Sequence, residues 1–165
     1  MLVLGVDPGT ATTGYSLVAE DVEGNDRLVR FGVIETRAHE AMAVRLRSIH
    51  ADLSALIRES APEAMAVEEL FFSRNVTTAL SVGQARGVVL LAAAQAGLPV
   101  YEYKPAEVKQ ALVGYGRASK AQVQEMVRMM LGLPEVPRPD DAADAIAVAI
   151  CHLHSQRLRQ LIDAG

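Results

Sequence analysis

The chain is poor in cysteine and in aromatic residues. Its 165 residues include a single cysteine, Cys151, and no tryptophan, so a disulfide within the chain is excluded and the core has to be largely aliphatic. The N-terminus lacks the basic segment of a signal peptide, and the longest uncharged stretch, residues 87–101, is interrupted by Gln95, Gly97 and Pro99. We therefore expect a cytosolic protein without a membrane-spanning segment.

The composition is that of one folded domain. Half of the residues are hydrophobic and 22% are charged, which is the balance of a globular protein. A chain of this length buries about 70% of the surface of its unfolded state, and dividing it would leave two small cores. We expect a single domain over residues 1–165. The net charge of −4 argues against a general electrostatic attraction to nucleic acid, so any such binding has to be local.

The spacing of apolar residues predicts five strands and five helices. The expected strands are 1–6, 15–19, 27–36, 65–70 and 100–103, and the expected helices are 41–57, 76–96, 105–113, 119–131 and 140–162. Short connections between the first three strands indicate an antiparallel meander. The order of the elements is typical of an α/β fold in which helices cover both faces of a mixed five-stranded sheet.

Four acidic residues lie at positions where a free charge is unexpected. Asp7 follows the apolar residues of the first strand and Glu68 those of the fourth, and α/β sheets bind their ligands at the carboxyl ends of strands. Asp141 and Asp144 are three residues apart at the start of the last helix, so they share one face. Simpler roles remain open: Asp7 can bond its own turn, Asp140 can cap the helix, and Asp141 can favour the helix dipole.

If the four carboxylates meet, they require cations. Two carboxylates about 4 Å apart repel each other by about 4 kcal/mol at an effective dielectric constant of about 20. Oxygen ligands without histidine or cysteine neighbours select Mg²⁺ or Mn²⁺ over Zn²⁺. Two such ions about 3.5 to 4 Å apart cleave phosphodiesters, because one activates water and the other stabilises the leaving oxygen. The acids therefore predict phosphoryl chemistry with two ions per site.

Positive charge is concentrated in the middle of the chain. Residues 70–134 contain seven basic and three acidic residues, whereas the remainder contains nine and seventeen. A basic segment beside a negative metal site fits a polyanionic substrate, although an ordinary solvated surface is the alternative. Two of the three phenylalanines, Phe71 and Phe72, follow Glu69, and one of them is placed to stack on an unpaired base. The basic residues are Arg74, Arg86, Lys104, Lys109, Arg117, Lys120 and Arg128.

Five motifs spread over nearly the whole chain resemble the RuvC family of Holliday junction resolvases. The motif Asp-x-Gly-Thr alone is unspecific, because actin-like ATPases and sugar kinases contain a similar turn. The five together are specific: residues 5–9 with 14–15, residues 67–71, residues 83–87, residues 108–110 and residues 141–145.

The resemblance implies a ribonuclease H-like fold and a homodimer that nicks two symmetry-related strands of a four-way DNA junction with divalent metal ions. It also implies a partner, the junction-binding and branch-migration helicase complex of RuvA and RuvB, and a role in recombination and repair. Helix 76–96 matches the helix through which the family dimerises. The residues that match the family's site are the metal-binding acids Asp7, Glu68, Asp141 and Asp144, the basic residues Lys109 and Lys120, and the junction-contacting Phe71.

Arg74, Arg86 and Arg117 are further expected contacts to DNA, together with Lys109 and Lys120. Three other functions remain open. A nuclease of the same fold can cleave RNA–DNA hybrids or plain duplexes, and an actin-like ATPase can use residues 7–10 on phosphate, although such enzymes need about twice this length. A junction-binding module without catalysis is disfavoured, because four uncompensated acids would repel DNA.

Overall fold

A computed structural model describes residues 1–69 and 75–163. All five predicted strands and five predicted helices are present in the predicted order, with ends that differ by up to three residues. The predicted end of the fourth strand at residue 70 lies outside the described residues. The elements are β1 (Leu2–Asp7), β2 (Thr12–Glu20), β3 (Asp26–Glu35), α1 (Met42–Ser60), β4 (Ala64–Glu68), α2 (Val76–Gln95), β5 (Val100–Tyr103), α3 (Pro105–Val113), α4 (Lys120–Met130) and α5 (Asp140–Asp163).

The five strands form one mixed sheet in the order β3-β2-β1-β4-β5. The pairs β1–β2 and β2–β3 are antiparallel, as the short connections predict, whereas β1–β4 and β4–β5 are parallel. Parallel neighbours need long crossovers, and α1 and α2 provide them. Because β1 and β4 run side by side in the same direction, their carboxyl ends reach the same edge of the sheet.

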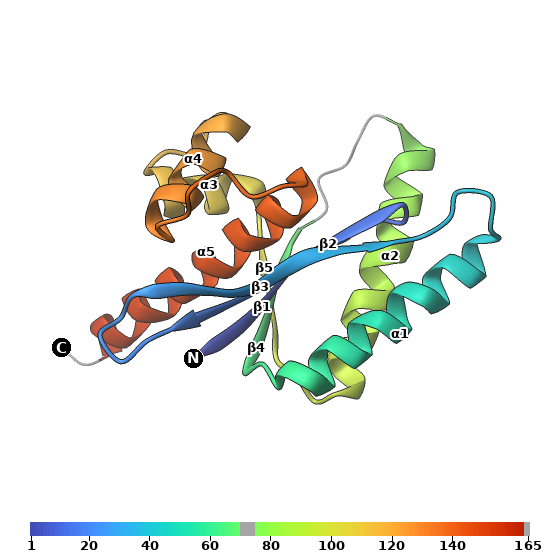
Figure 1. The fold of residues 1–165 in the computed structure, drawn as a ribbon, viewed down its shortest axis with the longest axis horizontal. Coiled ribbons are helices and arrows are strands. Elements are labelled where there is room, and N and C mark those ends of the chain that lie inside the picture. Colours follow the sequence, from blue (N-terminus) through green and yellow to red (C-terminus); the bar gives the residue numbers. More distant parts are fainter. Residues whose placement is uncertain (70–74, 164–165) are drawn as a thin grey trace.

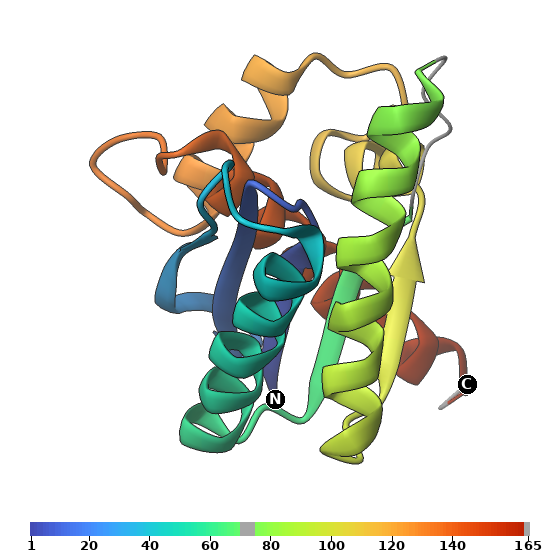
Figure 2. The ribbon, with the colours of Figure 1, turned by 90° about the vertical axis from the view of Figure 1, so that its right-hand side faces the viewer.

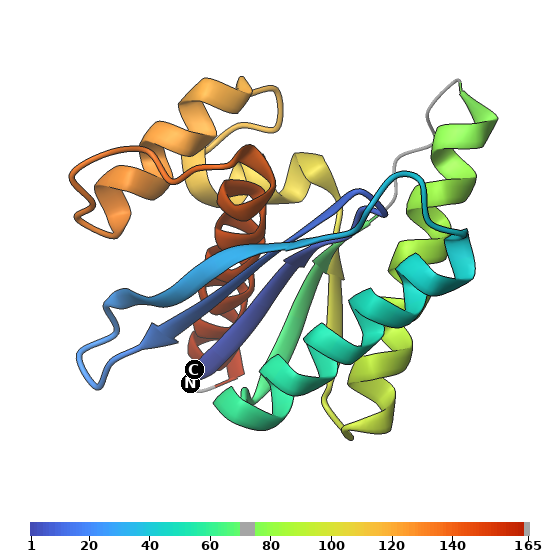
Figure 3. The same ribbon diagram turned by 45° about the vertical axis from the view of Figure 1, so that its right-hand side comes forward.

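Helices cover both faces of the sheet, as predicted. α5 lies on one face and α1 and α2 lie on the other, where they run next to each other (Figures 1, 2 and 3). Along β1 the side chains alternate between the two layers: Val3 packs into the core under α5, and Leu4 and Val6 pack into the core under α1 and α2. Both cores are built almost entirely from aliphatic side chains, as the shortage of aromatic residues requires.

α5 approaches the sheet closely at two glycines. A Cβ atom on Gly5 would lie 2.0 Å from the carbonyl oxygen of Ala145, and one on Gly14 would lie 2.0 Å from that of Asp141. Between them, the Ser16 hydroxyl donates a hydrogen bond of 2.9 Å to the Ala145 carbonyl. Because backbone touches backbone here, these contacts fix where the first turns of α5 stand over β1 and β2.

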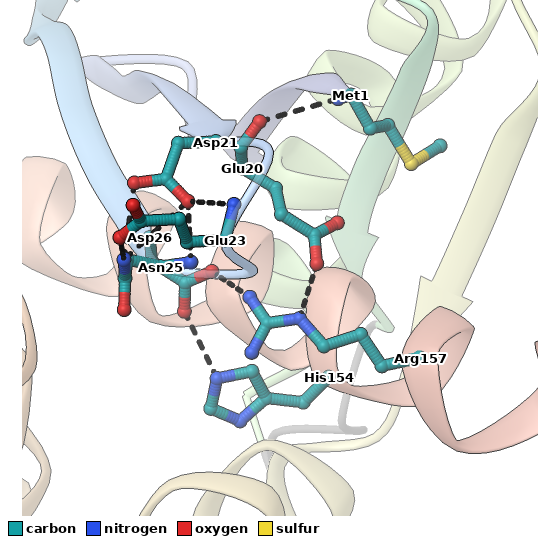
Figure 4. Close-up of polar contacts among 8 residues, drawn as sticks. All are labelled: Met1, Glu20, Asp21, Glu23, Asn25, Asp26, His154 and Arg157. Atoms are coloured by element: carbon teal, nitrogen blue, oxygen red, sulfur yellow. Dashed lines mark hydrogen bonds and ion pairs between the residues drawn. The ribbon is translucent and has the colours of Figure 1, made fainter. Parts of the chain in front are cut away.

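The other end of α5 is tied to the β2–β3 hairpin by charged side chains (Figure 4). The Arg157 guanidinium donates to the carboxylates of Glu20 and Asp26. His154 Nε2 lies 2.9 Å from Asp26 Oδ2, and the Asp26 side chain is only 6% exposed. Asp21 Oδ1 accepts the backbone N–H of Asn25 and closes the hairpin loop. The helix is therefore held against the sheet from its first turns as far as Arg157.

α2 is the one helix of the described residues that is long and apolar enough to cross a membrane, judged by length and composition alone. Four of its side chains pack into the core between α2 and the sheet. They are Ala85, Val89, Ala92 and Ala93. Other apolar side chains of α2 are exposed on the single chain, among them Val76, Leu80 and Leu91.

Candidate active site

Asp7 and Glu68 are the last residues of the parallel neighbours β1 and β4. The register pairs Val6 with Val67, so the two acids follow directly at the same level of the sheet. Val6 and Val67 both pack under α1 and α2. Because side chains alternate along a strand, Asp7 and Glu68 both face α5.

The first turns of α5 bring two more acids to this edge. The carbonyl of Asp141 rests against Gly14, and Gly14 is paired with Asp7 across β1 and β2. Asp144 follows one turn later on the same face of the helix. The structure thus brings together the four acids that the sequence singled out, from three separate elements.

The carboxylates interact strongly with one another. Burial raises the pKa of Asp7 to about 8, and the negative charges of Asp144, Glu68 and Asp141 act in the same direction. Burial and the charge of Asp144 also raise the pKa of Glu68, against the opposing effect of Lys109 and Lys120. Without added positive charge, the cluster therefore resists full ionisation at neutral pH.

Two lysines stand next to the acids. Lys120, the first residue of α4, donates a hydrogen bond of 2.9 Å to Asp144 Oδ2, and its Nζ lies 3.5 Å from Asp140 Oδ2. Burial works to lower the pKa of Lys120, but its contacts with Asp144 and Asp140 raise that pKa overall. Lys109 of α3 lines a pocket of about 270 Å³ together with Lys120, Asp144 and Glu68.

Asp140 takes part in this arrangement in a way that the sequence did not indicate. It was expected to cap the last helix, but it is the first residue of α5. Its carboxylate accepts hydrogen bonds from Gln124 and Arg138 and lies near Lys120. The hydrogen bond from Gln124 and the two cations lower the pKa of Asp140. Its only sequence signal was its place beside Asp141.

The other predicted DNA contacts lie away from the acids or outside the described residues. Arg86 on α2 pairs with Glu102 on β5. The neighbouring Tyr103 faces the core under α5, so Glu102 and Arg86 lie on the opposite side of the sheet from the acids. Arg117 is exposed in the loop between α3 and α4. Phe71 and Arg74 lie outside the described residues, and their roles stay predictions.

The donor set fits a hard divalent cation. The described residues that line the pocket offer carboxylates and no histidine or cysteine, and oxygen donors favour Mg²⁺ or Mn²⁺. Burial first, and then the charges of Asp144, Glu68 and Asp141, raise the pKa of Asp7, and a bound cation would favour its ionised form. In residues 1–69 and 75–163 no three such side chains are grouped closely enough to hold one ion together, and Mg²⁺ needs only one or two carboxylates because it keeps several waters.

We expect the metal-free protein to lose stability as the pH rises towards 8. The folded state holds a proton on Asp7 up to about pH 8, whereas the unfolded chain releases it near pH 3.8. Folding therefore binds a proton over this interval, and the stabilisation fades as the pH increases through it. Melting temperatures in EDTA should fall from pH 5 to pH 9 more steeply for the parent than for Asp7→Asn. Parallel curves would contradict the charge assignment.

Known proteins match nearly the whole chain. A model of the family "Crossover junction endodeoxyribonuclease RuvC" matches residues 3–152. The RuvC of Heliobacterium modesticaldum is 62% identical over 157 residues, which is 94% of this chain and 95% of that protein.

Solved structures agree with this assignment. Thermus thermophilus RuvC in complex with a Holliday junction substrate is 45% identical and has a TM-score of 0.91 over 96% of both chains. The yeast mitochondrial resolvase Ydc2 is 13% identical and has a TM-score of 0.70 over 96% of this chain and 82% of its own, which shows the fold alone. The expected ribonuclease H-like architecture is confirmed. Sheet order, acid placement and sequence identity agree, and the chain belongs to the crossover junction endodeoxyribonuclease RuvC family.

Proposed function

We propose that this chain resolves four-way DNA junctions by divalent-metal-dependent hydrolysis of phosphodiester bonds, in recombination and repair. The observation that carries the proposal is the convergence of Asp7, Glu68, Asp141 and Asp144 beside two lysines, in a chain 45% identical to a RuvC solved on a Holliday junction. Membership of this family also disfavours the actin-like ATPase.

Asp7 lies where the sheet-borne and helix-borne acids meet, so we assign it to both ions of a metal pair. Glu68 would help to hold one ion, and Asp141 and Asp144 the other. Bound metal ions supply activation of water and neutralisation of the departing 3′-oxygen, which gives 5′-phosphate and 3′-hydroxyl ends. Lys109 and Lys120 supply fixed positive charge to the phosphate that gains charge during attack.

Removing either lysine should slow cleavage and weaken the salt dependence of binding. For Lys109→Ala and Lys120→Ala we expect roughly 100-fold slower cleavage, and a salt slope of junction binding smaller by about one. Arg128→Ala is the matched control, because Arg128 is a half-buried cation of α4 that pairs with Glu125. Rates and slopes equal to those of the parent for both lysine variants would remove them from the site.

A homodimer fits both the substrate and the surface of α2. Two-fold symmetry would present two sites to a two-fold junction and so produce paired, symmetric cuts. The exposed apolar residues Val76, Leu80 and Leu91 offer a surface for a second copy of α2. Sedimentation of the parent and of Leu80→Glu would test this assignment, since the variant should be monomeric. A cytosolic location and the helicase complex of RuvA and RuvB remain parts of the proposal.

One assay separates the proposed function from its alternatives. The purified protein is incubated with a synthetic four-way junction, a linear duplex and an RNA–DNA hybrid, each in EDTA and in Mg²⁺, and the cuts are mapped. We expect cuts in the junction alone, in two opposed strands, and only with Mg²⁺. Cleavage of the hybrid would support the hybrid nuclease, and junction binding without cleavage in any metal would support the binding module.

A further inference from the structure

A second hollow lies on the other side of the acidic cluster from the lysine pocket. It has a volume of about 530 Å³ and is formed by the β1–β2 turn, the first turns of α2 and the start of α5. Among the described residues that line it there is no lysine or arginine. Its polar side chains are Thr10, Thr12, Thr77, Thr78, Ser81 and Asp141. We call this hollow the hydroxyl groove.

The floor of the hydroxyl groove is held in place by hydrogen bonds. Thr10 Oγ1 and Ser81 Oγ are 2.6 Å apart and join the β1–β2 turn to α2. The Thr13 hydroxyl donates a bond of 2.7 Å to the carbonyl of Gly9. A Cβ atom on Gly9 would lie 2.4 Å from the carbonyl oxygen of Thr12, so the turn depends on glycine there. These contacts fix the positions of the Thr10 and Ser81 hydroxyls in the structure without a ligand.

Asp141 connects the hydroxyl groove to the acidic cluster. Its charge acts on Asp7, whereas Asp144 and Glu68 line the lysine pocket on the other side. A nucleic-acid strand whose scissile phosphate lies at the acids has to continue in both directions. One direction leads along the lysine pocket and the other along the hydroxyl groove.

The chemistry of the lining favours a phosphodiester over other ligands. Serine and threonine hydroxyls are common donors to phosphate oxygens in protein–DNA complexes. The lining offers neutral hydroxyl donors beside the small apolar side chains of Ala11 and Val82. Its single carboxylate is one of the acids assigned to a metal ion, whose positive charge would offset it.

We propose that the hydroxyl groove binds the backbone phosphate next to the scissile phosphate on the cleaved strand, through Ser81, Thr77 and Thr78. This inference rests on the proposed function. The hydroxyl groove would thus contact the DNA backbone through neutral side chains, whereas the lysine pocket would contact it through Lys109 and Lys120.

Hydroxyl contacts and lysine contacts differ in their response to salt. Binding by lysine releases counterions from DNA, and binding by a hydroxyl does not. For Ser81→Ala and for the double variant Thr77→Val/Thr78→Val we expect roughly tenfold weaker junction binding in Ca²⁺ at every salt concentration. The slope of affinity against salt should equal that of the parent, whereas Lys109→Ala should reduce it.

The two variants have suitable controls. Ser81→Thr keeps the hydroxyl and should bind as the parent does. Ser48→Ala removes a hydroxyl that bonds only the Val44 carbonyl of its own helix, α1, and should be neutral. Thr77 and Thr78 are exposed on α2, so their replacement leaves the core intact.

A modified junction then tests the contact itself. Single phosphates on either side of the scissile one are replaced by neutral methylphosphonates, and the affinities of parent and Ser81→Ala are compared. We expect one position at which the modification weakens the parent about tenfold and weakens Ser81→Ala by less than threefold. Losses that add independently at every position, or variants that bind as the parent does, would overturn the inference. A parent that neither binds nor cuts the unmodified junction would instead refute the proposed function.

Discussion

Replacing Asp7 by asparagine is expected to abolish junction cleavage and to leave junction binding close to that of the parent. The amide keeps the shape of the carboxylate but removes the charge at the point where β1, β4 and α5 meet. If Asp7 helps to hold the metal ions, its loss would cost several kcal/mol of transition-state stabilisation, which corresponds to a rate at least about a thousandfold lower. Binding should persist, because the basic side chains that we propose as phosphate contacts are unchanged.

The measurement is single-turnover cleavage of a labelled junction in Mg²⁺, with binding followed separately in Ca²⁺. Asp52→Asn is the matched control, since Asp52 is an exposed aspartate of α1 on the far side of the sheet from the acids. That control should cut at the rate of the parent. Cleavage by Asp7→Asn within tenfold of the parent would show that Asp7 holds no essential ion.

Alanine at Gly14 is expected to displace the start of α5, and with it Asp141 and Asp144. Its Cβ atom would lie 2.0 Å from the Asp141 carbonyl oxygen and 3.0 Å from the Ala142 nitrogen, which are backbone atoms that cannot rotate away. The start of α5 has to move off the sheet, at a cost of about 1 to 3 kcal/mol in the free energy of unfolding. Cleavage should fall more than stability alone predicts, because Asp141 and Asp144 move together away from Asp7.

Chemical denaturation and cleavage are measured on the same preparation of Gly14→Ala. Gly87→Ala is the control for stability alone: a Cβ atom there would meet nothing within 4 Å of the single chain, but Gly87 shares the exposed face of α2 with Leu80 and Leu91. Alanine at that helical position should be neutral or stabilising by up to about 1 kcal/mol. A Gly14→Ala protein as stable and as active as the parent would show that α5 adjusts without cost.

The sequence predicted the elements and the four acids because both signals are local. Short apolar runs placed Asp7 and Glu68 at strand ends, and helical spacing placed Asp141 and Asp144 on one face. The contact of Lys120 with Asp144 was not predictable, because it joins two helices through a long side chain. Nor did composition reveal that Arg86 lies on the opposite face of the sheet.

The hydroxyl groove and the glycine contacts were also missed, for a related reason. Thr10 and Ser81 are 71 residues apart, and neutral hydroxyl residues carry no charge pattern that a sequence can display. Glycine within a strand has several explanations, so Gly5 and Gly14 became informative only when α5 was seen against them. Close approach between elements is a tertiary property.

The ion pairs of Arg157 near the end of α5 bear on how the enzyme responds to salt. Arg157 stands 13 residues beyond Asp144, about 20 Å along the helix, where it grips the hairpin through Glu20 and Asp26. Because α5 is held at Gly14 and again at Arg157, it cannot pivot on the sheet, so the distance between the acids on the strands and those on α5 is fixed. Dissolved ions screen exposed charges far more than buried ones, and the Asp26 side chain in this tie is only 6% exposed. The spacing between the strand-borne and helix-borne acids should therefore persist at high ionic strength, and any loss of activity there would come from weaker binding of DNA.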